Sequence, residues 1–220
     1  MESLVSLAQS AGAHGSTPLD VLAALTMIAV VPVIVVMCTS FVRIVVVLSL
    51  VRSAIGAAAL PPNTVLTGLA LVLTLVVMAP TLQRVAHDAI DPYAQGRLSQ
   101  SQALQRATAP LQAFMLRQTR LPDIALFERI AHRSPEPAAR APIVALVPAF
   151  VVGELRSAFA IGFALYLPFV AIDLAVAAIL MGLGMVMLSP PVVSLPVKLF
   201  LFVMVDGWAL VCGGVAASFR

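Results

Sequence analysis

Charged residues are scarce in this sequence. Only 10% of its 220 residues are Asp, Glu, Lys or Arg, whereas ordinary soluble domains carry about 25%. Hydrophobic residues make up 61% of the chain, and the mean hydropathy is +1.05. A chain with so few charged residues cannot cover its apolar side chains with the charged surface that a soluble domain has. The composition therefore predicts an integral membrane protein, and we expect it to be all-α, because helices satisfy their own backbone groups within a bilayer.

Residues that could act in catalysis, metal binding or redox reactions are also few. The two cysteines, Cys38 and Cys212, lie in apolar segments without metal or redox spacing and are interpreted as small core residues. His14, His87 and His132 are isolated, and no nucleophile stands at helical spacing from a base. Twelve of the thirteen basic residues are arginines, and they are scattered. These absences predict a protein that is not an enzyme, uses no cofactor or metal, and binds no nucleic acid.

The N-terminal stretch MESLVSLAQSAGAHGSTPLD lacks the basic n-region of a signal peptide and carries Glu2 instead. Residues 1–19 are therefore interpreted as a tail. We expect the first long apolar segment to act as its own insertion signal, unless a longer precursor has been trimmed.

Four long apolar runs dominate the rest of the sequence, at roughly residues 21–50, 63–80, 157–188 and 192–217. About 20 apolar residues span a bilayer as a helix, so each run can form a membrane segment. Prolines mark the expected breaks, because proline disfavours the helix at and before its own position. They stand in "LPPN" (Leu60–Asn63), in "MAP" (Met78–Pro80), and at Pro148, Pro168, Pro190–Pro191 and Pro196.

Charge is concentrated in residues 81–140, which hold eight arginines and five acidic residues. Two short amphipathic helices are predicted there. The first has apolar positions at Leu104, Ala107, Leu111 and Phe114, and Pro110 should kink or split it. In the second, the apolar face comprises Ile124, Phe127, Ile130 and Ala131, opposite Glu128, Arg129 and Arg133.

These patterns divide a single subunit into four parts. The N-terminal tail at 1–19 precedes a first hydrophobic hairpin at 20–80. The polar helical region occupies 81–140, and a second hydrophobic hairpin occupies 141–220. No internal repeat is visible.

Two acidic residues, Glu154 and Asp173, stand in the apolar C-terminal part of the sequence far from its ends. A charge at the membrane centre costs roughly 2.5–3.5 kcal/mol on insertion scales, so each must be stabilised by a partner. Asp173 has no charged neighbour between Arg156 and Lys198, and Glu154 stands only two residues from Arg156, too close to face it along one helix. We predict that Glu154 and Asp173 pair with groups on other helices or chains and have an assembly or functional role.

The remaining charges in apolar surroundings are candidate structural charges: Arg43, Arg156, Lys198 and Asp206. Lys198 and Asp206 lie eight residues apart, about two helical turns, so they are expected to share a face near the segment ends without touching. There they can be ion-paired or reach toward the interface. Acids and broken helices in apolar segments also leave open a small proton-coupled transporter, although repeated halves are lacking.

The stretch MGLGMVMLSPP (Met181–Pro191) combines methionines, glycines and a double proline after a membrane-length apolar run. In a single chain, adaptable methionines of this kind are ordinary core filling. In several copies around a symmetry axis, they would instead form a deformable apolar ring that excludes water and ions.

At this point the residues resemble a known family. MGLGMVMLSPPVVSLPVKLFLFVMVDGWALV (Met181–Val211) is similar to the C-terminal signature of FliP, the flagellar type III export-gate protein, and of its injectisome counterpart SctR. Four further stretches match in order: TSFVRIVVVLSLVRSAIG, PPNTVLTGLALVLTLVVMAP, PLQAFMLRQTR and PAFVVGELRSAFAIGFALYLPFVAIDL. "FMLRQTR" and "VDGW" resemble flagellar members more than injectisome members.

The resemblance implies a core subunit of the flagellar type III secretion export gate, which serves protein transport in flagellum biogenesis. Such a subunit forms a closed helical multimer, with five copies of itself in a ring and FliR-like and FliQ-like subunits. FlhB-like and FlhA-like export components are further expected partners. The assembly would conduct unfolded substrates through the bacterial inner membrane at the centre of the flagellar basal body. An SctR-type injectisome subunit is the alternative.

The resemblance also assigns site residues. The family's methionine gasket, which closes the pore, falls on Met185, Val186 and Met187, with Met181 one turn before. The family's functionally important aromatic and acidic positions fall on Phe114, Phe127, Glu154 and Asp173. Two departures stand out: Val186 replaces the middle methionine with a stiffer side chain, and Leu121-Pro122 replaces a polar pair.

Overall fold

The computed structural model of the chain describes residues 36–57, 60–132, 141–185 and 187–219, together with the single positions 29 and 33. The chain divides into two compact units, Met1–Met37 and Cys38–Arg220, and the helices below belong to the second. The tail at 1–19, the proposed insertion signal and much of the first apolar run lie outside the described residues.

The described part of the second unit is helical, without any strand, which confirms the all-α prediction. Its elements are α3 (Phe41–Ile55), α4 (Asn63–Val85), the π-helical turn η1 (Ala86–Ile90), α5 (Asp91–Ala94), α6 (Gln100–Gln118), α7 (Leu121–Ile130), α8 (Ile143–Gly182), α9 (Pro190–Met204) and α10 (Gly207–Ala217).

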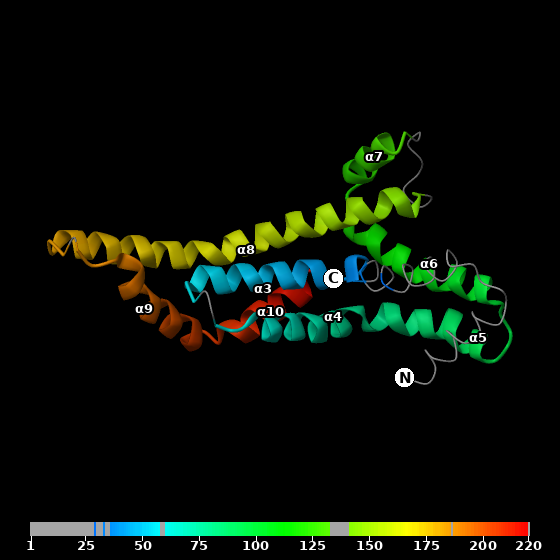
Figure 1. Ribbon diagram of the computed structural model, residues 1–220, viewed down its shortest axis with the longest axis horizontal. Coiled ribbons are helices and arrows are strands. Elements are labelled where there is room, and N and C mark those ends of the chain that lie inside the picture. The colour runs from blue at the N-terminus through cyan, green and yellow to red at the C-terminus, as the bar shows by residue number, and fades with distance from the viewer. Residues whose placement is uncertain are drawn as a thin grey trace, which may run out of the picture. The chain divides into compact units, whose positions relative to one another are not determined.

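Helix α3 lies at the centre of the packing (Figure 1). It packs most extensively against α8, and α4 packs against it as well. Helix α10 returns beside α3 and α4, and α9 packs against α8. Apolar residues recur on more than one side of α3, so that it can be covered by several neighbours at once.

Two apolar clusters result. The first, called the α3 cluster, contains the buried residues Ile44, Val47, Leu48, Val51, Ala54, Ile55, Leu66, Ala70, Ala158, Phe169, Phe202, Val211 and Val215. The second, called the Phe114 cluster, contains Cys38, Met78, Phe114, Met115, Ile124, Ala141, Leu146, Ala149 and Phe150. The Phe114 cluster therefore joins the start of α8 to the helices of the charged region.

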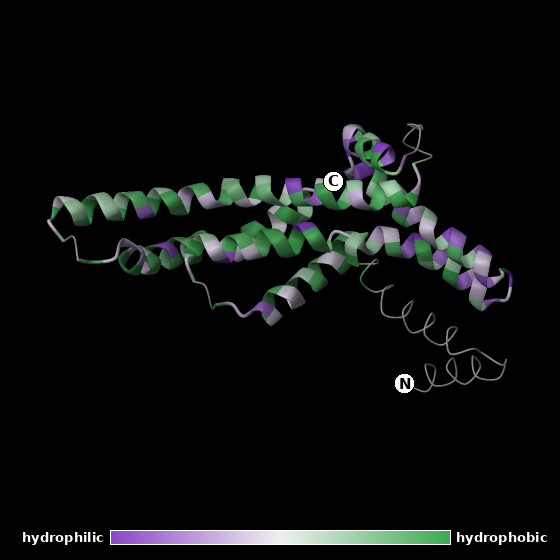
Figure 2. Ribbon diagram, turned by 45° about the horizontal axis from the view of Figure 1, so that its top comes forward, coloured by the Kyte–Doolittle hydropathy of each residue, from purple (hydrophilic) through white to green (hydrophobic). Residues whose placement is uncertain are grey.

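The helices of the charged region are positioned by local signals and by packing. Helix α6 begins with a capping box, in which Ser99 and Gln102 satisfy each other's backbone N–H groups. It packs against α4, η1 and α8, whereas α7 packs mainly against α8. Helix α7 starts at Leu121 with Pro122 in its first turn, where proline is well tolerated. Hydrophilic residues gather at the end of the molecule where α5 and α6 lie (Figure 2).

Several predicted breaks are wrong. Helix α4 continues through Pro80, α8 through both Pro148 and Pro168, and α9 through Pro196. Helix α6 also continues through Pro110, so a split there is wrong, while the predicted kink stays a prediction. A proline removes one backbone hydrogen bond and bends a helix. It does not end a long helix whose flanking turns are held by tertiary packing, as α8 is by α3.

The apolar runs also differ from their predicted bounds. Among the described residues, Asn63–Ala94 and Ile143–Gly182 are long and apolar enough to cross a membrane. The pair α9–α10 becomes a third candidate if it is taken as one span, although it bends by 65°. Thus the second run does not end at Pro80, the third begins before residue 157, and the fourth is two helices. The division into two hairpins and a polar region remains a prediction.

Candidate functional site

A deeply buried ion pair joins α3 to α8. Arg43 is 4% exposed and Glu154 is fully buried. Arg43 Nε donates to Glu154 Oε2 over 2.9 Å, and Nη2 donates to Oε1, so the guanidinium holds both carboxylate oxygens. Bidentate pairs of this kind are strong because both hydrogen bonds are charge-assisted. The predicted pairing of Glu154 with another helix is confirmed.

Arg43 uses all of its hydrogen-bonding capacity. A guanidinium carries five N–H donors, and five hydrogen bonds leave this one. Besides Glu154, the acceptors are Gln118 Oε1 on α6, at 3.2 Å, and the carbonyl and hydroxyl oxygens of Ser218, at 2.9 and 3.0 Å. One buried cation therefore links α3, on which it lies, to α6, to α8 and to the residues after α10 by hydrogen bonds.

The second ion pair joins α8 to α9. Lys198 Nζ donates to Asp173 Oδ2, and Ser194 Oγ donates to Oδ1. Lys198 is 6% exposed and also donates to the carbonyl of Ala54, in the last turn of α3, over 3.4 Å. The predicted pairing of Asp173 with another helix is confirmed. The assembly or functional roles of Glu154 and Asp173 remain predictions.

The expectation that Lys198 and Asp206 share a helix face is wrong, whereas the ion pair that was one of the two outcomes expected for Lys198 is confirmed. Helix α9 ends at Met204, and Asp206 is an exposed residue in the bend before α10, with a left-handed φ of 50°. It therefore shares no helix face with Lys198. Lys198 does not reach toward an interface, because Asp173 and the end of α3 hold its ammonium inside the protein.

The third ion pair fastens α7 to α8. Arg156 donates to both carboxylate oxygens of Asp123, over 2.7 and 2.9 Å. The Arg156 side chain is 45% exposed, whereas that of Asp123 is 9% exposed. Hydrogen bonding to Arg156 lowers the pKa of Asp123 despite the opposing effect of burial. The pair explains why α7 presents its Asp123 side to α8.

We expect Asp123→Asn to remove a pH-dependent part of the stability. A lowered folded-state pKa means that the carboxylate contributes fully above its unfolded-state pKa of about 3.9 and loses this contribution as the pH falls through the folded value. The effect is modest, because Arg156 is partly exposed. Melting temperatures in detergent, measured from about pH 7 to about pH 3, should converge for parent and variant at the acid end. Curves that stay parallel would contradict this, and Asp91→Asn at an exposed position is the control.

The two aromatic positions assigned by resemblance lie in or against the Phe114 cluster. Phe114 is 4% exposed and packs edge-to-face on Phe150, with ring centroids 5.9 Å apart. Its other side stacks on Phe219, at 6.3 Å. Phe127, on α7, is half-buried and packs against the same cluster.

The methionine stretch begins with Met181 in the last turn of α8 and continues into the turn that precedes α9. Met181 is 67% exposed, Met185 42% and Met187 99%, while Val186 lies outside the described residues. Gly184 has a φ of 73°, a left-handed conformation that suits glycine at the end of a helix. The chain therefore presents these methionines on a turn between α8 and α9, without burying them in its own core.

Sequence reasoning missed several of these residues. Glu128 was expected opposite the apolar face of its helix, and Asp123 was not singled out, yet both are buried, whereas Ile130 is 61% exposed. Buried Glu128 Oε1 has no hydrogen-bond partner within the described part of the chain. Ser194, Gln118 and Ser218 carried no local signal, because their roles depend on charges far away in the sequence.

The fold and its ion pairs define the class: an all-helical protein with membrane-length apolar helices held together by buried charges. Within the described residues, no group of His, Cys, Asp and Glu side chains could hold a metal ion. The FliP family profile matches residues 24–215. The chain therefore belongs to the FliP family.

Individual relatives agree with this assignment. The flagellar biosynthetic protein FliP of Pectobacterium carotovorum is 47% identical over 212 residues, which cover 94% of this chain and 81% of the relative. The FliP of Bacillus subtilis is 43% identical over 205 residues, 93% of each chain. The FliP of Buchnera aphidicola subsp. Acyrthosiphon pisum is 44% identical over 206 residues, and the chain spans just over half of it, 54%.

Proposed function

We propose that this protein is a core subunit of the flagellar type III secretion export gate. In this role it forms part of the inner-membrane channel for unfolded flagellar export substrates, at the centre of the basal body. Family membership and the flagellar names of its relatives carry the proposal. They favour it over the injectisome subunit and over the proton-coupled transporter.

The apolar surface of the chain supports an assembled state. Large apolar side chains are exposed along α4, on the C-terminal half of α8 and on α9; the most exposed include Val76 (64%), Phe163 (67%), Leu174 (66%), Phe200 (68%) and Val203 (75%). Lipid can cover some of this surface, and neighbouring helices can cover the rest. Other copies of the chain, with FliR-like and FliQ-like subunits, would be these neighbours. FlhB-like and FlhA-like components would attach to the assembly.

The native mass of the protein tests this proposal. The full chain would be co-expressed with its candidate small membrane partners and purified in mild detergent. We expect a large, discrete complex that contains several copies of this chain together with FliR-like and FliQ-like chains. A monomer or simple dimer that takes up no partner would overturn the proposal.

The methionine turn would close the channel. Met185 and Met187, repeated around the axis of a ring, would form an apolar constriction that excludes water and ions yet adapts to a passing chain. Their exposure at 42% and 99% leaves them available for this contact.

Replacing Met185 and Met187 with alanine is therefore expected to make the inner membrane leaky to ions. The smaller side chains would widen the constriction and let it hydrate. The measurement is ion leak in cells that express the assembled gate. Met204→Ala is the matched control, because Met204 is 68% exposed but lies at the end of α9. Normal expression with unchanged leak would refute the gasket.

A further inference from the structure

The residues after α10 make specific contacts with two other helices, α3 and α6. Ser218 accepts two hydrogen bonds from Arg43 Nη1, one at its carbonyl oxygen and one at its hydroxyl. Gln118 Nε2 donates to the carbonyl of Phe219 over 3.3 Å. Since Arg43 also holds Glu154, this short segment joins the network that links α3, α6 and α8.

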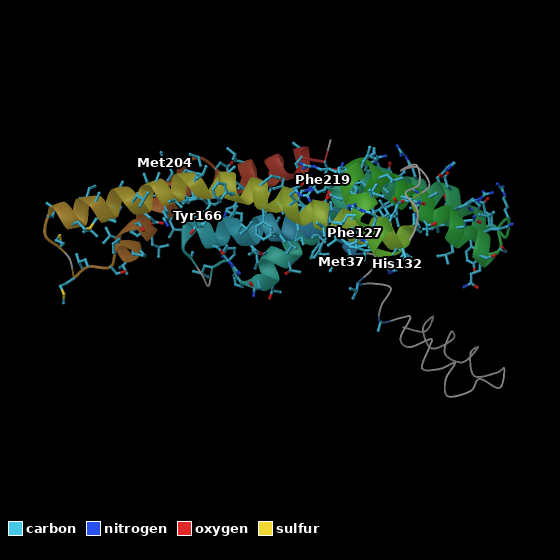
Figure 3. All side chains as sticks on the ribbon, turned by 90° about the horizontal axis from the view of Figure 1, so that it is seen from above. Met37, Phe127, His132, Tyr166, Met204 and Phe219 are labelled. Atoms are coloured by element: carbon cyan, nitrogen blue, oxygen red, sulfur yellow. The ribbon has the colours of Figure 1, made fainter. Side chains whose placement is uncertain are left out.

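The Phe219 ring contacts both a cation and an aromatic side chain. The Arg43 guanidinium carbon is 3.9 Å from the ring centroid, a cation–π contact. Phe114 stacks on the same ring at an interplanar angle of 25°. Figure 3 shows Phe219 beyond the C-terminal end of α10. The ring is thus held by two of the residues that form the candidate site.

Phe219 also connects the two apolar clusters. Among the described residues it alone is a partly buried hydrophobic residue that packs against both the α3 cluster and the Phe114 cluster. The α3 cluster holds the long apolar helices together, and the Phe114 cluster holds α6 and α7 onto α8. A side chain that packs against both restricts their relative movement.

We propose that Ser218 and Phe219 form a latch that locks the Phe114 cluster onto the α3 cluster. The latch holds the Arg43 guanidinium in the position in which it binds Glu154. It also packs against the Phe114 ring through the ring of Phe219. Phe114 and Glu154, which the family resemblance assigns separately, then belong to one unit. Phe219 is a positioning residue, because it acts through these two side chains.

Without the latch, the network loses specific interactions. Arg43 loses two acceptors for its Nη1 group if Ser218 moves away, and a buried donor without an acceptor is unfavourable. Removal of the Phe219 ring opens a gap beside Phe114 and between the clusters. The Phe114 cluster should then open locally more often, while α3 and α8 stay packed.

The chain contains a reporter for this opening. Cys38 is 7% exposed and belongs to the Phe114 cluster, and Cys212 is the only other cysteine. In the full chain carrying Cys212→Ala, Cys38 is the single thiol. We expect a small maleimide to label Cys38 about tenfold faster when Phe219→Ala is added, because labelling follows the population of the locally open state.

Matched variants decide the interpretation. Phe200→Ala removes an equally large but 68% exposed ring and should leave the labelling rate unchanged. Phe219→Tyr keeps the stacked ring and should also stay near the parent rate, whereas Phe219→Leu keeps bulk but not the ring and should label faster. If Phe219→Ala cannot be recovered folded, the Tyr and Leu variants carry the test. Equal rates for Tyr and Leu, or for Phe219→Ala and parent, would overturn the latch.

The assay requires neither assembly nor export. Its failure would therefore leave the proposed export-gate function standing, and failure of the native-mass experiment would leave the latch standing.

Discussion

Replacing Arg43 with alanine is expected to lower the free energy of unfolding by about 3–5 kcal/mol, the cost of breaking a buried ion pair from one side. Glu154 is fully buried, and both of its carboxylate oxygens are held by Arg43 alone among the described residues. Gln118 and Ser218 would also lose donors. For a chain of this size, the melting temperature in detergent should fall by roughly 10 °C or more.

Two variants separate lost charge from lost packing. The double substitution Arg43→Met with Glu154→Leu should recover much of the loss, because apolar residues can replace a buried ion pair at little cost. Arg52→Ala is the control, since Arg52 on the same helix is half-buried and, among the described residues, donates hydrogen bonds only to Pro61 and Asn63. A double variant as unstable as Arg43→Ala would show that the unpaired Glu154 carboxylate is not the cause of the lost stability.

Asp173→Ala should be more damaging than Lys198→Ala. Removal of Asp173 leaves the Lys198 ammonium, which is 6% exposed, with the carbonyl of Ala54 as its one acceptor within the described part of the chain. Removal of Lys198 leaves an Asp173 side chain that is 36% exposed and still accepts from Ser194. We expect losses of about 3 kcal/mol for the first variant and about 1 kcal/mol for the second, because the remaining Asp173 is less buried than Lys198 and keeps its hydrogen bond from Ser194.

The measurement is the melting temperature of each variant together with its incorporation into the native complex. Asp173→Glu keeps the charge and should assemble, whereas Asp173→Ala should not. Asp206→Asn is the matched control, since Asp206 is exposed and stands outside the α9 helix, and asparagine tolerates its left-handed φ of 50°. Full assembly of Asp173→Ala, or a larger effect of Lys198→Ala, would contradict the assignment.

The two ion pairs hold different parts of the molecule. Arg43 and Glu154 lie where the charged region meets the apolar helices, together with Gln118, Ser218 and Phe219. Asp173 and Lys198 lie along the hairpin of α8 and α9, which ends in the methionine turn. Loss of the first pair should therefore disturb the docking of α6, and loss of the second should disturb the position of the methionines.

Much about this protein was determined by the sequence alone. Composition predicted a helical membrane protein, because a chain with 10% charged residues cannot form an ordinary soluble surface. The isolation of Glu154 and Asp173 predicted partners on other helices, because an unpaired charge in apolar surroundings is costly wherever the chain folds. Such conclusions depend on the local sequence, so they do not require knowledge of the tertiary arrangement.

Only the tertiary structure decided which residues those partners are. Arg43 lies 111 residues from Glu154 and 175 from Ser218, and no sequence pattern pairs positions so far apart. The burial of Asp123 and Glu128 and the continuation of α8 through Pro148 and Pro168 likewise depend on contacts with other helices. Packing between distant segments outweighs local preference here, because a long apolar helix gains more from its neighbours than one proline or one polar residue removes.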